Sequence, residues 1–210
     1  MTRMILDCGM SVLDAATGKI LFHCGSPADA GRGMMANVGA GGHYQIWGDF
    51  EEENGGRIPL PPRKKTDSGF EPAEIPGLTS NFRIFWDGRP YDDLLDGEPG
   101  GELEIRAFNG ERMETIFRTE GCVSIHGSKA VPCLQADLLG DWREELIMAR
   151  KDQEALRVFV SNIPTEYSLM TLMHDPLYRS GVAAEQTGYN QPPHIDFCLR
   201  AAGDAGDGSQ

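Results

Sequence analysis

The sequence predicts an all-β chain. Its 210 residues include 26 glycines and 13 prolines, spread along the chain, which is too many for a helix bundle. From residue 82 onward, short apolar runs alternate with turn-forming residues. This pattern is typical of a sandwich, a barrel or a propeller, and we expect no helix longer than two turns.

The first part of the chain contains one clear hairpin. Residues 10–14 and 20–23 are its predicted strands, and Gly18 lies in the turn, where glycine adopts a positive φ at little cost. A weaker strand is expected at 44–47. Residues 49–80 are rich in Glu, Gly and Lys and contain five prolines, so we predict a long loop or insertion there.

Strand-like runs then follow up to the expected domain end near residue 200. They cover 82–86, 102–108, 114–117, 122–125, 146–149, 156–161, 168–173, 182–186 and 195–199. The segment 143–157 consists largely of strong helix formers. Because an acidic turn precedes it, we predict strands there instead, with a turn at 151–154. The tail 201–210 is expected to be disordered.

The net charge of −13 limits the partners of this chain. It argues against nucleic acid, and an acidic polysaccharide would bind only through a metal ion or a local cationic pocket. No run of 18 apolar residues exists, so we expect no membrane-spanning segment. The N-terminus lacks a secretory signal, which predicts either a cytoplasmic chain or one that begins within a longer protein. Five irregularly spaced cysteines indicate neither a disulfide framework nor a zinc site.

An acidic loop is the clearest candidate metal site. Asp137, Asp141 and Glu145 recur at every fourth residue, and the carbonyls of Leu139 and Arg143 lie between them. Oxygen ligands at alternate positions suit Ca²⁺, which takes about six to eight of them. The alternative is a solvated acidic turn before an edge strand, and the spacing alone does not decide between the two.

A second segment looks like a degenerate copy of this loop. Asn37 and Gln45 stand about 100 residues upstream in a similar pattern, which indicates a repeat. Their uncharged side chains make this copy a poor calcium site. The loop lysine Lys129, the histidine His126 and the arginine Arg32 between two glycines carry no weight by themselves, because such residues are usually solvated.

Several segments together resemble one family, the family 11 polysaccharide lyases. The matching segments include Ala-Asp-Leu-Leu-Gly-Asp-Trp-Arg-Glu-Glu at 136–145, and they occur in the expected order at 29–36, 81–89, 132–147, 167–179 and 189–194. These rhamnogalacturonan lyases are built on an eight-bladed β-propeller with bound calcium. The resemblance covers residues 8–200 except 49–80 and implies about three blades from the C-terminal part.

The resemblance also implies a function and a site. The expected reaction is β-elimination at the rhamnosyl-(1→4)-galacturonosyl bond of rhamnogalacturonan I in pectin, by a secreted or extracellular protein. The cleft would contain Arg32, Lys129 and Tyr189 as catalytic residues, and His126, Gly127 and Ser128 as substrate contacts. His126 stands where the family usually has Asn, and Asn37 replaces an Asp.

The chemistry of β-elimination explains these residue types. The C5 proton of a uronate is removed only when the adjacent carboxylate is neutralised, by calcium or by an arginine such as Arg32. A lysine of lowered pKa, Lys129, would take the proton, and Tyr189 would stack on a sugar or donate a proton. The residues alone leave these roles interchangeable.

Two other readings stay open. The chain would be a non-catalytic, calcium-stabilised piece of a propeller that binds acidic glycan, or a propeller that binds other proteins. Blades missing from the ring would leave open sheet edges. We therefore expect a poor enzyme by itself, one that binds substrate weakly, associates through its open edges, or needs a companion chain that supplies the missing blades.

Overall fold

The computed structural model contains four antiparallel sheets and one α-helix among the residues that it describes. These residues are 4–6, 11–24, 29–41, 43–51, 57–127, 129–187, 190–197 and 199. In chain order the sheets are β1 (Met4–Leu6), β2 (Ser11–Asp14) and β3 (Ile20–His23); β4 (Asp29–Ala36), β5 (Gln45–Glu51), β6 (Arg57–Thr66) and β7 (Gly69–Pro72); β8 (Phe82–Ile84), β9 (Asp93–Gly97), β10 (Leu103–Phe108) and β11 (Met113–Arg118); and β12 (Cys122–Val123), β13 (Leu134–Ala136), β14 (Glu145–Arg150) and β15 (Leu156–Phe159).

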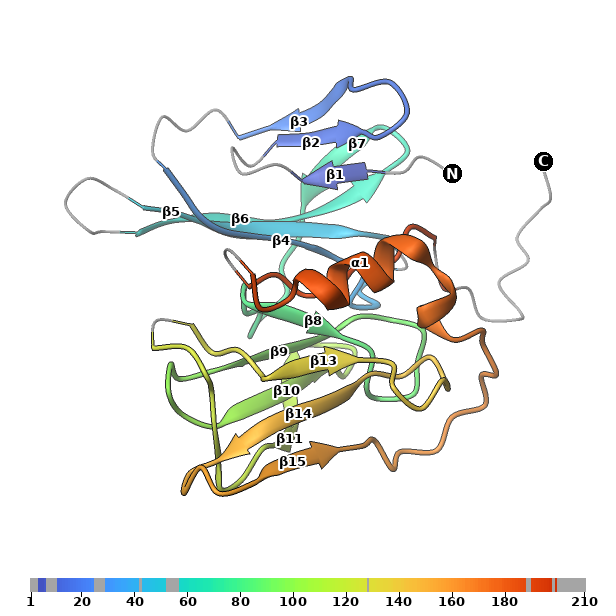
Figure 1. The fold of residues 1–210 in the computed structure, drawn as a ribbon. Helices are drawn as coiled ribbons and strands as arrows, with labels where there is room; N and C mark the ends of the chain where they lie inside the picture. Colours follow the sequence, from blue (N-terminus) through green and yellow to red (C-terminus); the bar gives the residue numbers. More distant parts are fainter. Residues whose placement is uncertain are drawn as a thin grey trace.

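The four sheets follow one another as layers (Figure 1). Strands run in sequence order across the second and third sheets, and β14 is central in the fourth, with β12 and β13 on one side and β15 on the other. The helix α1 (Pro176–Ala184) lies beside β13 and follows a 3₁₀ turn, Leu172–His174. None of these sheets closes on itself within the described residues, so the propeller stays a prediction.

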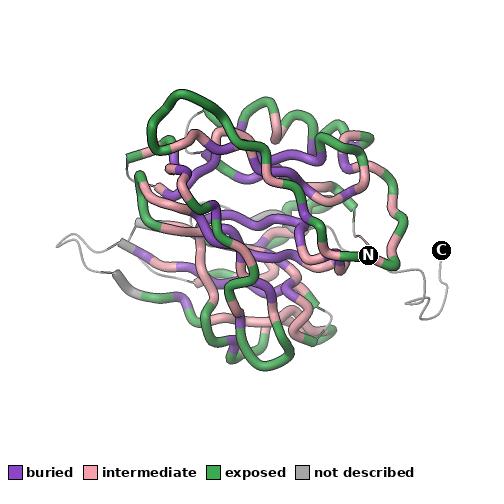
Figure 2. Tube along the Cα trace, turned by 90° about the horizontal axis from the view of Figure 1, so that it is seen from below, coloured by how far each residue is buried: buried purple, intermediate pink, exposed green. Residues whose placement is uncertain are grey.

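Apolar clusters fill the spaces between neighbouring layers. Phe50 and Leu60 of the second sheet meet Phe22 of the first, and Trp47 and Leu94 belong to the cluster between the second and third sheets. The largest cluster joins the third and fourth sheets; its buried members include Phe82, Ile84, Trp86, Leu95, Leu103, Ile105, Leu146 and Met148. Figure 2 shows the buried residues along the strands and the exposed residues along the connecting loops.

A repeated clamp joins successive sheets through polar groups. Asp92, directly before β9, donates its amide to the carbonyl of Asn37 at 2.8 Å, and its carboxylate accepts the Asn37 amide at 2.7 Å. Glu144, directly before β14, makes the same two bonds with Phe85, at 2.9 and 2.8 Å. Asn37 and Phe85 are each the first residue after the first strand of their sheet.

The helix takes over this clamp at the fourth sheet. The equivalent residue there is Asp137, whose amide donates to the Tyr178 hydroxyl of α1 at 3.0 Å. Tyr178 in turn donates to Glu144 Oε1 at 2.7 Å. The helix therefore caps the loop end of the last described sheet.

In the second, third and fourth sheets, the first residue of β5, β9 and β14 holds the preceding loop. Gln45 accepts the amide of Val38 at 3.0 Å, and Glu145 accepts that of Leu138 at 2.7 Å. Asp93 accepts the amide of Trp86 in the same way at 3.1 Å. The pattern expected from Asn37 and Gln45 is thus a structural repeat, and it includes a third copy that the sequence analysis missed.

The hairpin and the contested strands agree with expectation. Strands β2 and β3 flank a turn in which Gly18 has φ of 68°. Segment 143–157 forms β14 and β15 with a turn between them, despite its helix-forming residues. None of the helices in the described part of the chain is long and apolar enough to cross a membrane.

Other expectations differ from the structure. Residues 49–80 contain β6 and β7 rather than one long loop; Pro59, Pro61 and Pro62 lie inside β6, where prolines argue against a strand. The described residues form four sheets, not about three blades. No strand is assigned to the described residues of the expected runs 168–173, 182–186 and 195–199.

The helix α1 also exceeds the expected limit, because nine residues make about 2.5 turns. Asp175 caps it by accepting the Leu177 amide at 2.8 Å, and Pro176 occupies its first turn. Both residues are typical helix starts, so the Asp-Pro pair was the missed signal. Residues 201–210 lie outside the described part of the chain.

Candidate functional site

Arg32 projects from β4 at an irregularity of the sheet. The register of β4 against β5 shifts between Ala30 and Gly33, and shifts of this kind redirect side chains. The Arg32 amide donates to Asp49 Oδ1 at 3.1 Å. Its guanidinium donates from Nη1 to the Asn81 carbonyl at 2.8 Å and from Nη2 to the Asn190 carbonyl at 3.4 Å. Arg32 thus joins two loops that are distant in sequence.

Partial burial shapes the electrostatics of this arginine. Burial lowers the pKa of Arg32, while the negative charges of Asp96 and Asp49 act in the opposite direction. Arg32 also lies 5.9 Å from the centre of the Phe82 ring. A half-buried guanidinium held in this way is preorganised to meet an anion.

Lys129 lies on the loop between β12 and β13, which Ser124 closes from within. The Ser124 hydroxyl donates to the Lys129 carbonyl at 2.8 Å and accepts the Val131 amide at 3.0 Å. The backbone adds a bond from the Ile125 amide to the Val131 carbonyl at 3.2 Å. Ser124 is itself buried, so the loop has a defined shape.

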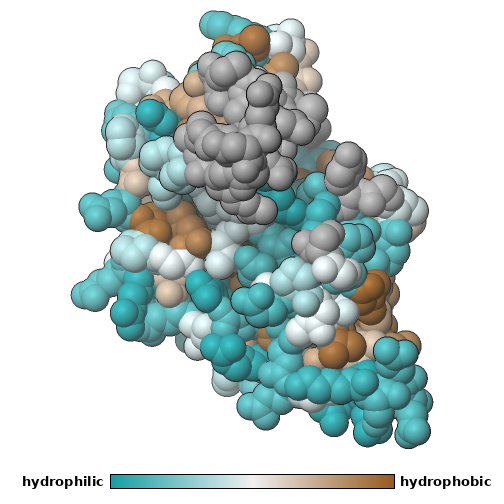
Figure 3. Space-filling view, turned by 90° about the vertical axis from the view of Figure 1, so that its left-hand side faces the viewer, coloured by the Kyte–Doolittle hydropathy of each residue, from teal (hydrophilic) through white to brown (hydrophobic). Residues whose placement is uncertain are grey.

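The two cations lie close enough to interact. Burial lowers the pKa of Lys129, and the positive charge of Arg32 lowers it further. A lowered pKa increases the fraction of neutral amine, which is the form that can accept a proton. Figure 3 shows the left-hand side of the view in Figure 1, toward which the β12–β13 loop extends. The described surface on this side is mainly hydrophilic.

The structure places only some of the predicted site residues. Arg32 and Lys129 come together, and His126 and Gly127 lie on the Lys129 loop, half-buried and exposed respectively. Tyr189 and Ser128 lie outside the described residues. Asn190, the residue after Tyr189, contacts Arg32, and residue patterns alone did not single it out.

Protein donors surround the carboxylate of Asp137 in the acidic loop. Its Oδ1 accepts the Gly140 amide at 2.8 Å. Its Oδ2 accepts the Trp142 amide at 3.2 Å, the Leu172 amide at 2.7 Å and the Thr171 hydroxyl at 2.7 Å. This buried carboxylate therefore ties the loop to the segment before α1.

The other expected calcium ligands are engaged in similar ways. Glu145 Oε2 accepts the Leu138 and Leu139 amides at 2.7 and 3.0 Å, and Asp141 pairs with the Arg143 side chain. Burial raises the pKa of Glu145, and the charges of Asp141 and Asp137 raise it further.

These hydrogen bonds occupy carboxylate oxygens that a metal ion would need. Within the described part of the chain, no three His, Cys, Asp or Glu side chains form a group that could hold one. Although the three acidic groups lie near each other, both oxygens of Asp137, both oxygens of Asp141 and Oε2 of Glu145 face N–H or O–H donors. Calcium at Asp137, Leu139, Asp141, Arg143 and Glu145 stays a prediction from the sequence.

Comparisons with known proteins identify the family of this chain. Residues 2–205 match the model of the C-terminal domain of rhamnogalacturonan lyase family 11. The chain is 38% identical over 199 residues to rhamnogalacturonan exolyase YesX of Bacillus subtilis (strain 168), covering 91% of this chain and 32% of that protein. It is 40% identical over 194 residues to rhamnogalacturonan endolyase YesW of the same organism, covering 91% and 28%.

Two solved structures have the same fold. The crystal structure of the exotype rhamnogalacturonan lyase YesX superposes with a TM-score of 0.79 at 37% identity, over 92% of this chain and 32% of that one. A Bacillus licheniformis rhamnogalacturonan lyase gives a TM-score of 0.72 at 36% identity, over 90% and 30%. The chain thus spans about a third of the length of the relatives it matches.

Proposed function

Because this chain belongs to rhamnogalacturonan lyase family 11, we propose that it carries residues that cleave rhamnogalacturonan I by β-elimination. The bond would be the rhamnosyl-(1→4)-galacturonosyl bond of the pectin backbone. The observation that carries this proposal is that Asn81 contacts both the Arg32 guanidinium and the carbonyl of Ala130, next to Lys129, which brings the two cations near each other. Both residues lie within the part of the chain that matches the family model, and together they place positive charge where an acidic chain otherwise repels a uronate.

The proposed reaction assigns one task to each cation. Arg32 binds the galacturonosyl carboxylate and stabilises the negative charge that grows on it as the C5 proton leaves. The neutral amine of Lys129 takes that proton. The electron pair of the C5–H bond forms the C4=C5 double bond, the C4–O4 bond breaks, and the departing oxygen takes a proton from Tyr189 or water. The reverse assignment of Arg32 and Lys129 is the second version of this proposal.

The four layers would be blades of a propeller whose remaining blades come from elsewhere. The support is the open stack of described sheets and the coverage of about a third of each relative. A companion polypeptide would supply those blades and the rest of the cleft. The extracellular location expected from the resemblance stays a prediction.

The small part of each relative that this chain matches also favours a second candidate function. This chain spans 28 to 32% of the length of the two lyases. It would bind acidic glycan without cleaving it if the unmatched part of those lyases supplies an essential catalytic group. Positioning of every group is needed for the transition state, whereas binding tolerates the loss of some contacts.

A cleavage and binding assay tests both candidates. Rhamnogalacturonan I oligosaccharides are added to the chain, and the ultraviolet absorbance of the new double bond and the dissociation constant are measured. We expect binding with slow cleavage, which Lys129→Ala reduces by about 100-fold or more while binding remains. Lys151→Ala, which alters an exposed lysine paired with Glu102, is the matched control and leaves both unchanged.

The outcomes separate the two functions. Binding without any cleavage product, also after the remainder of YesX is added, would support the glycan-binding alternative. Neither binding nor cleavage under both conditions would overturn the proposed function altogether.

A further inference from the structure

Asn81 contacts the segments that carry the two cations. It touches the side chain of Arg32 and the backbone of the Lys129 loop. It is 8% exposed and directly precedes β8. Its carbonyl accepts Arg32 Nη1 at 2.8 Å, and its side-chain amide Nδ2 donates to the carbonyl of Ala130, the residue after Lys129. One buried residue of the third sheet therefore holds Arg32 of the second sheet and the Lys129 loop of the fourth.

We propose that Asn81 is a positioning residue that sets the separation of Arg32 and Lys129. The inference rests on the proposed function for its biological meaning, but its geometry does not depend on the substrate. Asn81 acts through the two cations, and we assign it no contact with reacting atoms.

The other bonds of the loop show what Asn81 adds. Ser124 already closes the Lys129 loop through the Lys129 carbonyl and the Val131 amide. Loss of the Asn81 amide would therefore leave the loop's internal bonds in place. What would be lost is the bond that fixes Ala130 next to Lys129 against the residue that holds Arg32. The loop would stay attached to the third sheet through the Ser124 amide, which donates to the Gly101 carbonyl at 2.7 Å, but the separation of Lys129 and Arg32 would be less constrained.

The physical consequence concerns both chemistry and binding. Like charges that move apart interact less, so the effect of Arg32 on the pKa of Lys129 would shrink. A clamp and a base that must act on adjacent carbon atoms of one sugar also lose their alignment when their separation changes.

The test measures the pKa of Lys129 directly, without substrate. The side-chain resonances of Lys129 are assigned with Lys129→Arg and titrated by NMR in wild type, Asn81→Ala and the nearly isosteric Asn81→Leu. We expect both Asn81 variants to raise the pKa by about half a unit, in the same direction as Arg32→Gln. Asn109→Ala is the matched control, because Asn109 is exposed in the β10–β11 turn, where its side chain accepts the amides of Glu111 and Arg112 at 2.9 Å.

A second measurement follows the dissociation constant for the oligosaccharide, which we expect to rise by about threefold to tenfold in the Asn81 variants. If Arg32→Gln shifts the pKa of Lys129 and a folded Asn81 variant does not, the inference is overturned. If wild type binds no oligosaccharide, the proposed function fails, whereas the pKa comparison still decides the role of Asn81.

Discussion

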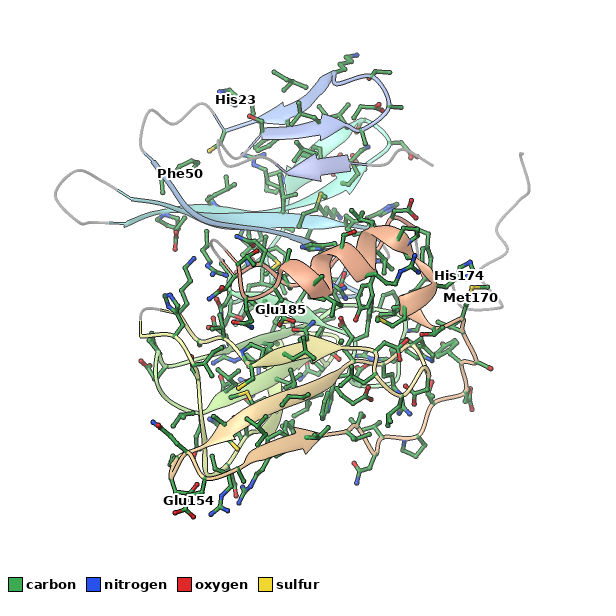
Figure 4. All side chains as sticks on the ribbon, viewed as in Figure 1. His23, Phe50, Glu154, Met170, His174 and Glu185 are labelled. Carbon is green, nitrogen blue, oxygen red and sulfur yellow. The ribbon has the colours of Figure 1, made fainter. Side chains whose placement is uncertain are left out.

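Glu185 ties the end of α1 to the fourth sheet through a single buried carboxyl group. Both of its oxygens accept the Gln135 amide, at 3.0 and 2.9 Å, and the residue is 1% exposed. Figure 4 shows Glu185 between α1 and β13, whereas Glu154 lies at the outer end of the β14–β15 turn. Burial raises the pKa of Glu185 to about 8.

This raised pKa makes the stability of the fold depend on pH. A carboxyl group whose pKa is higher in the folded state than its ordinary 4.5 favours folding most below pH 4.5, and this contribution is lost as pH rises through about 8. We expect the wild type to lose a few kcal/mol of unfolding free energy between pH 6 and 9, measured by urea denaturation. Glu185→Gln should flatten this slope, and the exposed control Glu154→Gln should not. A slope unchanged by Glu185→Gln would assign the loss to other groups.

Arg83 shows a residue whose role no local pattern predicts. It is 2% exposed, contacts Glu144 at 3.2 Å and Asp92 at 3.5 Å, and donates two bonds to the Pro193 carbonyl. A lone arginine in a strand normally faces solvent. The acidic residues that compensate its charge come from the two clamps, which only the folded chain brings together.

At the scale of elements, β14 shows why propensity misleads. Helix propensity favours the residue types of this segment, Glu, Leu, Met and Arg, over typical strand formers by up to about 0.7 kcal/mol per residue. Burial of Leu146 and Met148, both 0% exposed on one face of the strand, stabilises by about 1.5–3 kcal/mol each. Packing against the third sheet therefore outweighs the local preference.

The acidic loop provides a prediction about a single element. Asp137→Asn replaces a carboxylate oxygen that accepts three bonds, so buried donors lose their partner. We expect the unfolding free energy to fall by about 1–3 kcal/mol, equally in EDTA and in calcium buffer. Asp152→Asn, in the exposed turn after β14, is the control. A calcium-dependent gain in the wild type that Asp137→Asn abolishes would establish the metal site that the spacing predicts.

For the whole molecule, the outer face of the fourth sheet is an exposed surface among the described residues. Leu156 and Val158 are 63% and 58% exposed there, and Val158 pairs with Ile147 in β14. A surface hollow of 650 Å³ at one end of this face is lined by Val123, Ser124, Ile125, Ala149, Gln153, Glu154, Ala155 and Leu156. At the other junctions, an apolar cluster covers the equivalent space.

We expect a companion polypeptide to cover this face. The part of YesX outside the matched region is mixed with this chain, and the dissociation constant is measured by calorimetry. Leu156→Lys with Val158→Lys should weaken association by about tenfold or more, because two apolar side chains are replaced by charges that must be desolvated. Ile116→Lys on β11 is the control, since that side chain is also partly exposed but lies on the third sheet. Equal affinities in all three proteins would contradict this docking face.

The sequence by itself determined the all-β character, the hairpin at 10–23, the strands at 143–159 and the repeat of the loops before β5 and β14. These features depend on local patterns: turn residues, alternating side chains and recurring spacings. The family match also selected Arg32 and Lys129, although nothing local distinguishes them from solvated cations.

Only the tertiary structure decided which polar groups meet. Asn81, Asn190 and Tyr178 take their roles from partners at least 34 residues away, and Arg83 is held by Glu144 and Pro193, which are 61 and 110 residues away, as well as by Asp92. A single sequence carries no signal of such distant contacts. The same holds for Asp137, because its spacing suits calcium but its folded neighbours are hydrogen-bond donors. A buried polar group must find a partner, and packing of the sheets determines which partner is within reach.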